Sequence, residues 1–582
     1  MRNLWRQAVL WVFLIPTVRA QAANVNNLLI PDLNLVGPGV AIRLTPSGTA
    51  YVASTVALAL IPEIAIAKMP FEAKSATFAS LPTVGINSMQ LRFFQNPRAI
   101  DVSTVSPNMV FVRVHDSNIS VTAIGSGRID DIPLTGPLEI RASRFQLDAR
   151  VQIMRNPRGN PTMKVDLCRV NPNVPVTVNV QNGLTTETGI KFANAVSRDG
   201  HTLFQDLICP RLIFLIEKRI NQRFGLLNPR ISLGDIQDFD LVKSILASQQ
   251  EEMKRKVFRK KRLRDDSMYR LHYSSGMAMA RSKRQANRSK RQTQRFHTFL
   301  NNFNLTRANS LILDYTMMNT PIMSARGIEF ATSGEITSVG QKTPFGPRPL
   351  ALPLTVSANM LQMVVSDFVP NTLMFHGHKI GLFNARIDSN TPQLGPVMHT
   401  TCDMSSGSLF CVGDLFPTLR DLFPNRAVAF TFSTYKAPAI VVRPPELGGI
   451  RFQMVGLIDV AMFTGNAESS IGTMEIYVNA SMKMRLSSKA VRGKVNLDSI
   501  KLVSRTPRTL VQEELDDAGF LSREILQRMV NDILKQGIPI PVHPLFKLLK
   551  PKLIVADRSL ILETNFQLNQ NLIRQLTSER LS

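Results

Sequence analysis

The sequence predicts an α+β fold in which long antiparallel strands are accompanied by a few long helices. Apolar and polar residues alternate without a break along residues 474–486, and the same alternation returns at 145–153 and 428–432. A period of two places one face of a strand in the core and the other in water. Strands longer than the usual five or six residues indicate large, strongly curved antiparallel sheets.

The C-terminal half contains one clearly predicted helix. A possible capping box, Thr509 with Gln512, precedes it, and Gly537 with Pro539 would end it. Between these signals, apolar residues recur at four-residue spacing in two adjacent stripes: Ile525, Met529, Ile533 and Leu526, Val530, Leu534. Such stripes are typical of a helix with one buried face.

The N-terminal half repeats this order of elements. Residues 212–224 predict a similar helix, which Gly225 would end, and apolar helix-like stretches open the two halves at 51–61 and 360–369. Each half is therefore expected to run from helix through many strands to helix, as a pseudo-repeat with little residue identity.

The first residues indicate a signal peptide. A basic start precedes the apolar residues 8–16, and Val18-Arg19-Ala20 provides small residues for signal peptidase. The apolar run, at about nine residues, is too short to cross a bilayer. We expect residues 1–20 to be removed, with a cut after Ala22 as the alternative, and the protein to be secreted and extracellular.

Four cysteines fit an oxidising compartment. The simplest pairing keeps each disulfide within one half of the chain, Cys168 with Cys209 and Cys402 with Cys411. Zinc binding is the competing interpretation, but neither pair has the CxxC spacing of common zinc sites.

The formal net charge of +26 is concentrated in one segment. Sixteen basic and four acidic residues lie within 251–297, whereas the flanking regions are only mildly basic. A nucleic-acid partner is therefore not expected. Residues 246–297 are low in apolar periodicity and predict a disordered insertion.

The sequence RSKRQANRSKRQ, residues 281–292, repeats the pattern Arg-x-Lys-Arg. It could bind nucleic acid, direct the chain to the nucleus, or be cut by a protease. In a secreted chain the last is favoured, with cleavage after Arg284 or Arg291, because proteases cut exposed flexible segments. An uncut, solvated loop is the alternative.

Several segments resemble one family in their order along the chain. They are PGVAIRLT at 38–45 followed by Gly48 and Tyr51, MLQMVVSDFVPNTLMF at 360–375, GIRFQMVGLIDVAMF at 449–463 and GIPIPVHP at 537–544. Together they resemble the bactericidal/permeability-increasing protein family, which includes lipopolysaccharide-binding, phospholipid-transfer and cholesteryl-ester-transfer proteins. Thr49 departs from that pattern, where the family usually has leucine.

The resemblance implies a boomerang of two tubular lipid-binding domains joined by a central sheet, each a twisted sheet wrapped on a long helix. It implies an N-terminal barrel over 24–317 interrupted by 246–297, a linker at 318–325, a C-terminal barrel over 326–566 and a polar tail at 567–582. Residues 311–317 would be the last strand of the first half, feeding the central sheet. Cys168 and Cys209 would form the family's N-terminal disulfide.

No catalytic motif is evident. HExxH, GxSxG and GxxxxGK are absent from the sequence, so we expect no enzymatic activity and no cofactor. Gly125-Ser126-Gly127 is interpreted as a hairpin turn. His376 and His378 could bind metal from one face of a strand, but a turn or a surface pair is favoured.

The leading functional hypothesis is binding and transfer of phospholipid or similar acyl lipids in apolar tubes. Methionine, with 24 residues, suits an irregular apolar wall. Transient contact with a membrane or lipoprotein surface would follow, and the sequence does not name individual lipid-binding residues.

Two alternatives remain open: an antibacterial protein that binds lipopolysaccharide, and an extracellular scaffold that binds no lipid. Defensive family members use a basic tip, but the corresponding segment 122–133 places Arg128 beside Asp130 and Asp131, which weakens the first alternative. Four glycosylation sequons are predicted as sites, at Asn118, Asn287, Asn304 and Asn479.

Overall fold

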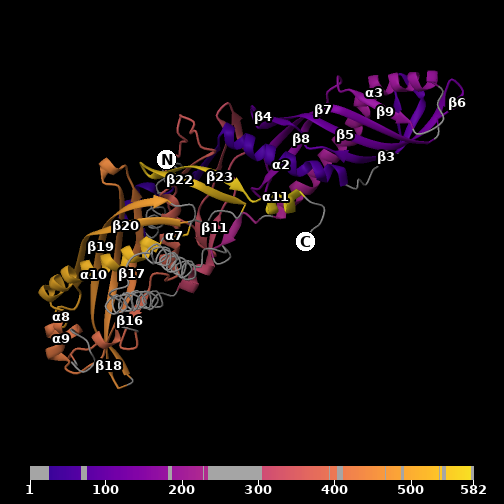
Figure 1. Ribbon diagram of the computed structural model, residues 1–582. Coiled ribbons are helices and arrows are strands. Elements are labelled where there is room, and N and C mark those ends of the chain that lie inside the picture. Colours follow the sequence, from indigo (N-terminus) through magenta and orange to yellow (C-terminus); the bar gives the residue numbers. More distant parts are fainter. Residues whose placement is uncertain are drawn as a thin grey trace, which may run out of the picture.

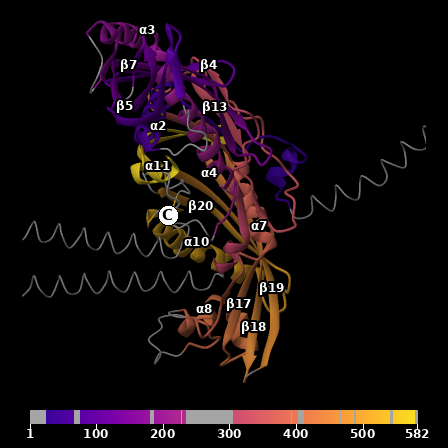
Figure 2. The same ribbon diagram turned by 90° about the vertical axis from the view of Figure 1, so that its right-hand side faces the viewer.

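The computed structural model is elongated, with one lobe at each end and a sheet between them (Figure 1). The N-terminal part of the chain builds one lobe, and the later part builds the other (Figure 2). The structure describes residues 25–66, 75–134, 136–180, 186–226, 228–233, 305–391, 394–402, 411–465, 467–486, 490–536, 538–539 and 545–577.

The N-terminal lobe is a curled antiparallel sheet. Its strands pair in the order β2 (Ser75–Phe78), β3 (Leu81–Phe94), β5 (Met109–Ile129), β7 (Gly136–Arg155) and β8 (Pro161–Val170). Three further strands join it: β4 (Ala99–Val105) and β6 (Ile132–Pro133) pair with β5, and β9 (Val176–Val180) pairs with β7. The alternation predicted at 145–153 lies within β7.

Helices complete this lobe. Helix α2 (Pro46–Ile66) precedes the sheet, and a continuous helical run follows it: α3 (Thr186–Ile213), the π-helical segment η2 (Phe214–Ile220) and α4 (Asn221–Leu226). The predicted helices at 51–61 and 212–224 are thereby confirmed. Their apolar residues and the inner face of the sheet form the largest core cluster, with Phe145, Phe192 and Phe204 fully buried.

The hairpin turn of this lobe lies later than predicted. Gly125 to Gly127 are inside β5, and the turn falls at Asp130 and Asp131, which both have positive φ. Gly127 is needed for close approach, because a Cβ there would lie 2.1 Å from the carbonyl oxygen of Thr83 on β3. The glycines therefore mark tight strand packing rather than a turn.

The C-terminal lobe is a second curled antiparallel sheet. Its order is β16 (Ala385–Ile387), β17 (Val428–Val442), β18 (Ile450–Thr464), β19 (Ala467–Leu486), β20 (Ala490–Ser504) and β21 (Ile538–Pro539). The predicted strand at 474–486 is part of β19, and the predicted long helix is α10 (Gln512–Gln536). Two short helices, α8 (Val412–Leu415) and α9 (Pro417–Leu422), lie at the far end of the lobe (Figure 1).

The central sheet draws strands from both ends of the chain. Its order is β12 (Ile322–Ser324), β13 (Gly327–Thr332), β1 (Val40–Leu44), β15 (Leu361–Ser366), β23 (Ser559–Leu568) and β22 (Phe546–Ala556). Strand β1 is thus enclosed by strands that follow it by almost 300 residues or more. Four short 3₁₀ helices in the described residues lie outside the sheets: η1 (Asn27–Asp32), η3 (Leu305–Ser310), η4 (Gly395–Val397) and η6 (Pro445–Leu447).

Two expectations around the central sheet were wrong. Residues 360–369 are not one helix: they form β15 and then enter α7 (Phe368–Lys379), because their apolar residues alternate with period two up to Ser366. Strand β11 (Leu311–Asp314) does not join the central sheet but pairs with β10 (Arg230–Ser232) and β14 (Ile336–Ser338). The expected polar tail contains helix α11 (Gln570–Thr577), whose Ile573 is buried beside Phe566.

Buried charges join the chain's two ends. Arg558 contacts both carboxylate oxygens of Asp32, at 2.5 and 3.3 Å, and donates to Asp367 at 2.6 Å. Burial disfavours the charged form of the Arg558 side chain. The hydrogen bonds to Asp367 and Asp32 favour that form more strongly, so the pKa of Arg558 is raised. Arg43, 1% exposed, bonds Glu329 on one neighbouring strand and Gln362 on the other. These groups fix the junction, because breaking a buried pair leaves an uncompensated charge.

Candidate functional site

Helix α2 is apolar around its whole circumference. Glu63 is its one charged residue, and it is the one helix in the described part of the chain that is long and apolar enough, over Pro46–Ile64, to span a bilayer by length and composition. An apolar surface on all sides indicates that α2 has apolar surroundings on all sides.

Three apolar clusters surround α2. Tyr51, Val52 and Ala59 face the central sheet and α11, where the Tyr51 ring packs edge-on against Phe566 at 5.8 Å. Ala53 joins a cluster shared by β4, β5 and β13. On the third side, Val56 packs against the core of the N-terminal lobe. The helix therefore lies between the central sheet and the N-terminal sheet.

Many side chains of α2 are only partly covered by other protein atoms. From Tyr51 to Ala57 the side chains are half-buried, and Leu58 is 43% exposed. Leu58 belongs to none of the described apolar clusters. An apolar helix that lies inside the molecule but is incompletely covered leaves apolar surface for a ligand.

Helix α10 faces the C-terminal sheet with one side only. Leu515 and Ala518 are buried there, and Leu526 and Val530 are partly buried against strands β19 and β20. Partly buried aromatic and methionine side chains of β17, β18 and β19 add to the same face: Phe430, Phe432, Phe452, Met454 and Met482. This face is a second, smaller candidate for apolar ligands.

Each lobe is closed by the same contact between a helix and a sheet edge. In α4, the side-chain amide of Asn221 accepts from the Met163 N–H at 2.8 Å and donates to the Met163 carbonyl at 2.6 Å. Four residues earlier, Glu217 accepts from the Val165 N–H at 2.8 Å. We call these contacts the N-terminal seam.

The C-terminal seam has the same geometry. Asn531 accepts from the Val495 N–H at 2.7 Å and donates to the Val495 carbonyl at 2.8 Å. Gln527, again four residues earlier, accepts from the Leu497 N–H at 2.8 Å. Because free strand edges need partners, these side chains complete the two curled sheets.

The turn at the far end of the N-terminal lobe is not a basic cluster. Lys191 of α3 forms an ion pair with Asp130, and this bond raises the pKa of Lys191. Asp131 follows in the turn, and the exposed Arg128 is the last residue but one of β5. The acidic turn therefore offsets the positive charge that lies beside it.

The two histidines form neither a turn nor a surface pair. Both lie on α7, where Nδ1 of the fully buried His376 contacts Ser338 Oγ at 3.0 Å and Nε2 contacts Thr343 Oγ1 at 2.9 Å. His378 Nδ1 contacts Thr434 Oγ1 at 2.6 Å. Burial, and then Lys379, lowers the pKa of each histidine to about 4. They serve as neutral core residues that join α7 to its neighbours.

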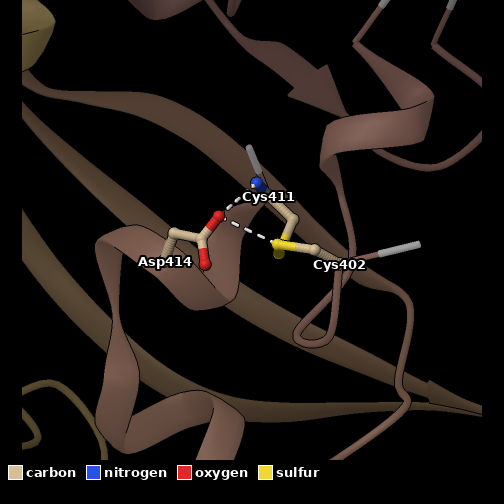
Figure 3. A group of neighbouring side chains, drawn as sticks. All are labelled: Cys402, Cys411 and Asp414. Atoms are coloured by element: carbon tan, nitrogen blue, oxygen red, sulfur yellow. Dashed lines mark hydrogen bonds between the residues drawn. A yellow bond between two sulfur atoms is a disulfide. The ribbon is translucent and has the colours of Figure 1, made fainter. Parts of the chain in front are cut away.

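The structure joins Cys168 to Cys209 and Cys402 to Cys411. Cys402, Cys411 and Asp414 are the one cluster of potential metal ligands in the described ranges (Figure 3). Asp414 Oδ2 accepts from the Cys411 N–H at 3.1 Å and lies 2.8 Å from Cys402 Sγ. Because the disulfide occupies both sulfurs, no thiolate is available and the carboxylate acts as a helix cap.

Two of the predicted sequons can be placed. Asn118 and Asn479 are exposed on β5 and β19. Asn287, Asn304 and the predicted cleavage residues Arg284 and Arg291 lie outside the described residues.

Sequence reasoning missed the residues that distinguish this site. The signal for α2 was its single charged residue within 21 residues. A helix with one face in water usually carries more charged residues on that face. The signal for the seams was an Asn preceded at four residues by Glu or Gln, near the end of a long helix in each half.

Residues 306–568 match the sequence model of the LBP / BPI / CETP family, C-terminal domain. Residues 306–568 therefore belong to this family, as its C-terminal domain. A bactericidal permeability-increasing protein from Sebastes schlegelii is 24% identical over 264 residues, which is 44% of this chain and 53% of that protein. A lipopolysaccharide-binding protein from Bos taurus is 23% identical over 261 residues, with 44% and 52% covered.

The chain thus spans about half the length of the curated relatives it matches. A crystal structure of a lipopolysaccharide binding protein aligns over 92% of this chain and 100% of that chain, with 15% identity and a TM-score of 0.47.

Proposed function

We propose that the protein is a secreted, non-enzymatic carrier that binds phospholipid or similar acyl lipids along α2 and along the inner face of α10, and exchanges them with membranes or lipoproteins. The observation that carries this proposal is the apolar surface of α2, which lies between two sheets and is only half covered. Membership of a family whose relatives are named for permeability increase and lipopolysaccharide binding supports it.

The energetics favour reversible exchange. Moving an acyl chain from water to an apolar surface gains about 0.8 kcal/mol per CH₂ group. Between a bilayer and an apolar space beside α2, the chain leaves one apolar medium for another, so this gain nearly cancels. Transfer is then governed by access and head-group contacts rather than by the affinity for the tail.

Native mass spectrometry of the secreted chain, with transfer of a labelled phospholipid between vesicles, tests the proposal. We expect co-purified lipid and measurable transfer. A Leu58→Asp variant should fold, because Leu58 is 43% exposed, but should lose lipid, since acyl chains would bury its charge.

The matched control is Leu447→Asp, because Leu447 is 57% exposed on η6, in the C-terminal half of the chain. It should transfer lipid like the unchanged protein. A chain that carries no lipid and moves none would contradict the proposal and favour a scaffold that binds no lipid.

Binding of lipopolysaccharide is a second candidate, favoured by the name of the relative from Bos taurus, a lipopolysaccharide-binding protein. The acidic turn at Asp130 and Asp131 opposes it at the end of the N-terminal lobe, so residues 246–297 would have to provide the charge. Affinity for lipopolysaccharide, compared between the full chain and a chain without 246–297, decides: a loss on deletion supports it, and equal weak binding rejects it.

Cleavage after Arg284 or Arg291 is proposed to nick the protein without separating it. Strand β1 pairs with β13 and β15, so chain segments before and after the cut share one sheet. Neither disulfide crosses the cut. The secreted protein should give two bands on a denaturing gel and one particle in solution. A single band would reject cleavage, and two particles would reject the shared sheet as the holding contact.

A further inference from the structure

A cavity of about 580 Å³ lies apart from the apolar faces of α2 and α10. Three segments line it: residues 34–36 after η1, residues 341–345 after β14, and the side chains of Phe375 and Lys379 on α7. None of its lining residues belongs to α2, α10 or the two curled sheets. Its volume lies in the range of small-ligand sites, roughly 300–1,000 Å³.

One part of the cavity is apolar. Phe345 and Phe375 are buried and pack edge-to-face with ring centroids 5.8 Å apart. Leu35 and Val36 also line it, yet they are 37% and 91% exposed. A wall that begins at buried aromatic rings and continues onto exposed aliphatic side chains fits a ligand with an apolar tail.

The other part is cationic. Lys342 and Lys379 are exposed, and neither forms an ion pair with another described residue. The Lys379 ammonium lies 5.7 Å from the centroid of the Phe375 ring. No lining residue is acidic, and Glu335, which does not line the cavity, accepts the hydroxyl of Thr343. The two ammonium groups are therefore available to an anion.

Backbone contacts hold the walls in place. Asn34 N–H donates to the Pro344 carbonyl at 3.2 Å, and Gly346 N–H donates to the Asp32 carbonyl at 3.0 Å. A Cβ on Gly346 would lie 1.9 Å from the Leu35 carbonyl oxygen, so the two segments are in close contact. Asp32 is itself held by Arg558 and Arg348. A site built in advance loses little entropy when it binds.

We propose that this cavity binds a single-chain anionic amphiphile. Its phosphate or carboxylate would lie at Lys342 and Lys379, where charge-assisted hydrogen bonds are strong. Its chain would begin over Phe345 and Phe375 and leave across Leu35 and Val36. The anionic group could come from a fatty acid or from a lysophospholipid, which share this chemistry.

The test uses the full secreted chain and calorimetric titration with dodecyl phosphate and dodecanoate as monomers. Uncharged dodecyl maltoside tests the tail alone, and inorganic phosphate tests the head group alone. We expect a saturable site for both anionic probes. K342Q/K379Q should weaken their binding by about tenfold or more, because the variant loses the charge-assisted hydrogen bonds to the anionic group. The preferred probe identifies the source of the anion.

Two further variants make the result specific. V36D places a carboxylate on a 91% exposed position and should repel the anionic probes without affecting folding. K494Q/K501Q removes two exposed lysines of β20 and should leave the site unchanged.

Equal binding by the unchanged protein and K342Q/K379Q would overturn the proposal. So would lysine-dependent binding to vesicles of phosphatidylcholine with phosphatidic acid but not to the monomeric probes, because the surface would then be a membrane contact. Phospholipid transfer should be unchanged in K342Q/K379Q, which separates this site from the proposed lipid spaces beside α2.

Discussion

Helices α2 and α10 differ in how much of their surface the protein covers with apolar groups. Helix α2 has one charged residue and apolar neighbours on three sides. Helix α10 carries charges throughout its length and presents one apolar face to one sheet, with Phe520 left 75% exposed. The helix that lies between two sheets is thus apolar on all sides, whereas the helix that packs on one sheet is apolar on one side.

The N-terminal and C-terminal seams, unlike helices α2 and α10, are alike. Asn221 and Asn531 make the same pair of bonds to an edge strand, and Glu217 and Gln527 repeat the same spacing. The two lobes therefore share the device that closes the sheet and differ in what lies inside it. Four experiments can break or sharpen this comparison.

The disulfides should show the largest difference between the lobes. Cys168–Cys209 closes 41 residues and Cys402–Cys411 closes nine. Loop-closure entropy predicts losses of about 4 and about 2.6 kcal/mol when each pair is replaced by serine. Urea unfolding of C168S/C209S and C402S/C411S measures both, and an equal or reversed order would show that loop length does not govern their contribution.

The seams should contribute similarly in both lobes. Asn221→Ala and Asn531→Ala each leave a backbone N–H and a carbonyl without a partner, which costs about 1–3 kcal/mol. The cost should be higher for Asn531, because Val495 is only 4% exposed. Urea unfolding is the measurement, and the exposed helix variants Gln222→Ala and Asp517→Ala are controls. If only one of the two variants lowered the free energy of unfolding, the two seams would not be equivalent.

Acid should destabilise α7 through its histidines. The pKa of His376 is lowered to about 4 by burial and then by Lys379, whereas an unfolded histidine titrates near 6.5. The contribution of neutral His376 to stability is complete above about pH 6.5 and is lost as pH falls toward 4. Over this range the histidine of the unfolded chain takes up a proton, whereas the buried histidine of the folded chain does not. The loss is about 2 kcal/mol at about pH 5.

The variant His376→Asn removes this titration. The difference in unfolding free energy between about pH 7 and about pH 5 should then be smaller than in the unchanged protein. An unchanged difference would assign the acid sensitivity to other groups.

The smallest effect is expected at the ends of the lobes. Asp130→Asn frees Lys191 from its ion pair and adds one positive charge to the turn. Binding to anionic vesicles should rise by a small factor, about two- to threefold at low salt, and the gain should vanish at high salt. Asp421→Asn on α9 makes the same charge change at the other end and should have less effect, unless the C-terminal lobe contacts the membrane.

The sequence predicted regular elements better than their partners. Alternation identified the strand within β19 and periodicity identified α10, because both patterns are local. Residues 360–369 were misassigned because Met363, Val364 and Val365 form a short continuous apolar run that fits a strand or a helix. The glycines of β5 were misread because close approach to Thr83, not a turn, requires Gly127.

Long-range contacts carried no local signal. The Arg558 side chain meets Asp32 across 526 residues, and the cavity beside Lys342 and Lys379 joins three distant segments. The spacing of His376 and His378 gave no sign that His376 would be fully buried and His378 half-buried. These features depend on tertiary packing, which a periodicity analysis does not contain.

The position of β1 also determines when the protein can finish folding. The ribosome releases β1 long before it makes β13 and β15, the two strands that pair with it. Strand β15 in turn waits for β23, near the end of the chain. Until Arg558 emerges, the buried carboxylate of Asp32 has Arg348, which is 45% exposed, as its partner. A late truncation that removes β23 would leave one edge of β15 unpaired, so the protein should depend on chaperones until synthesis is nearly complete.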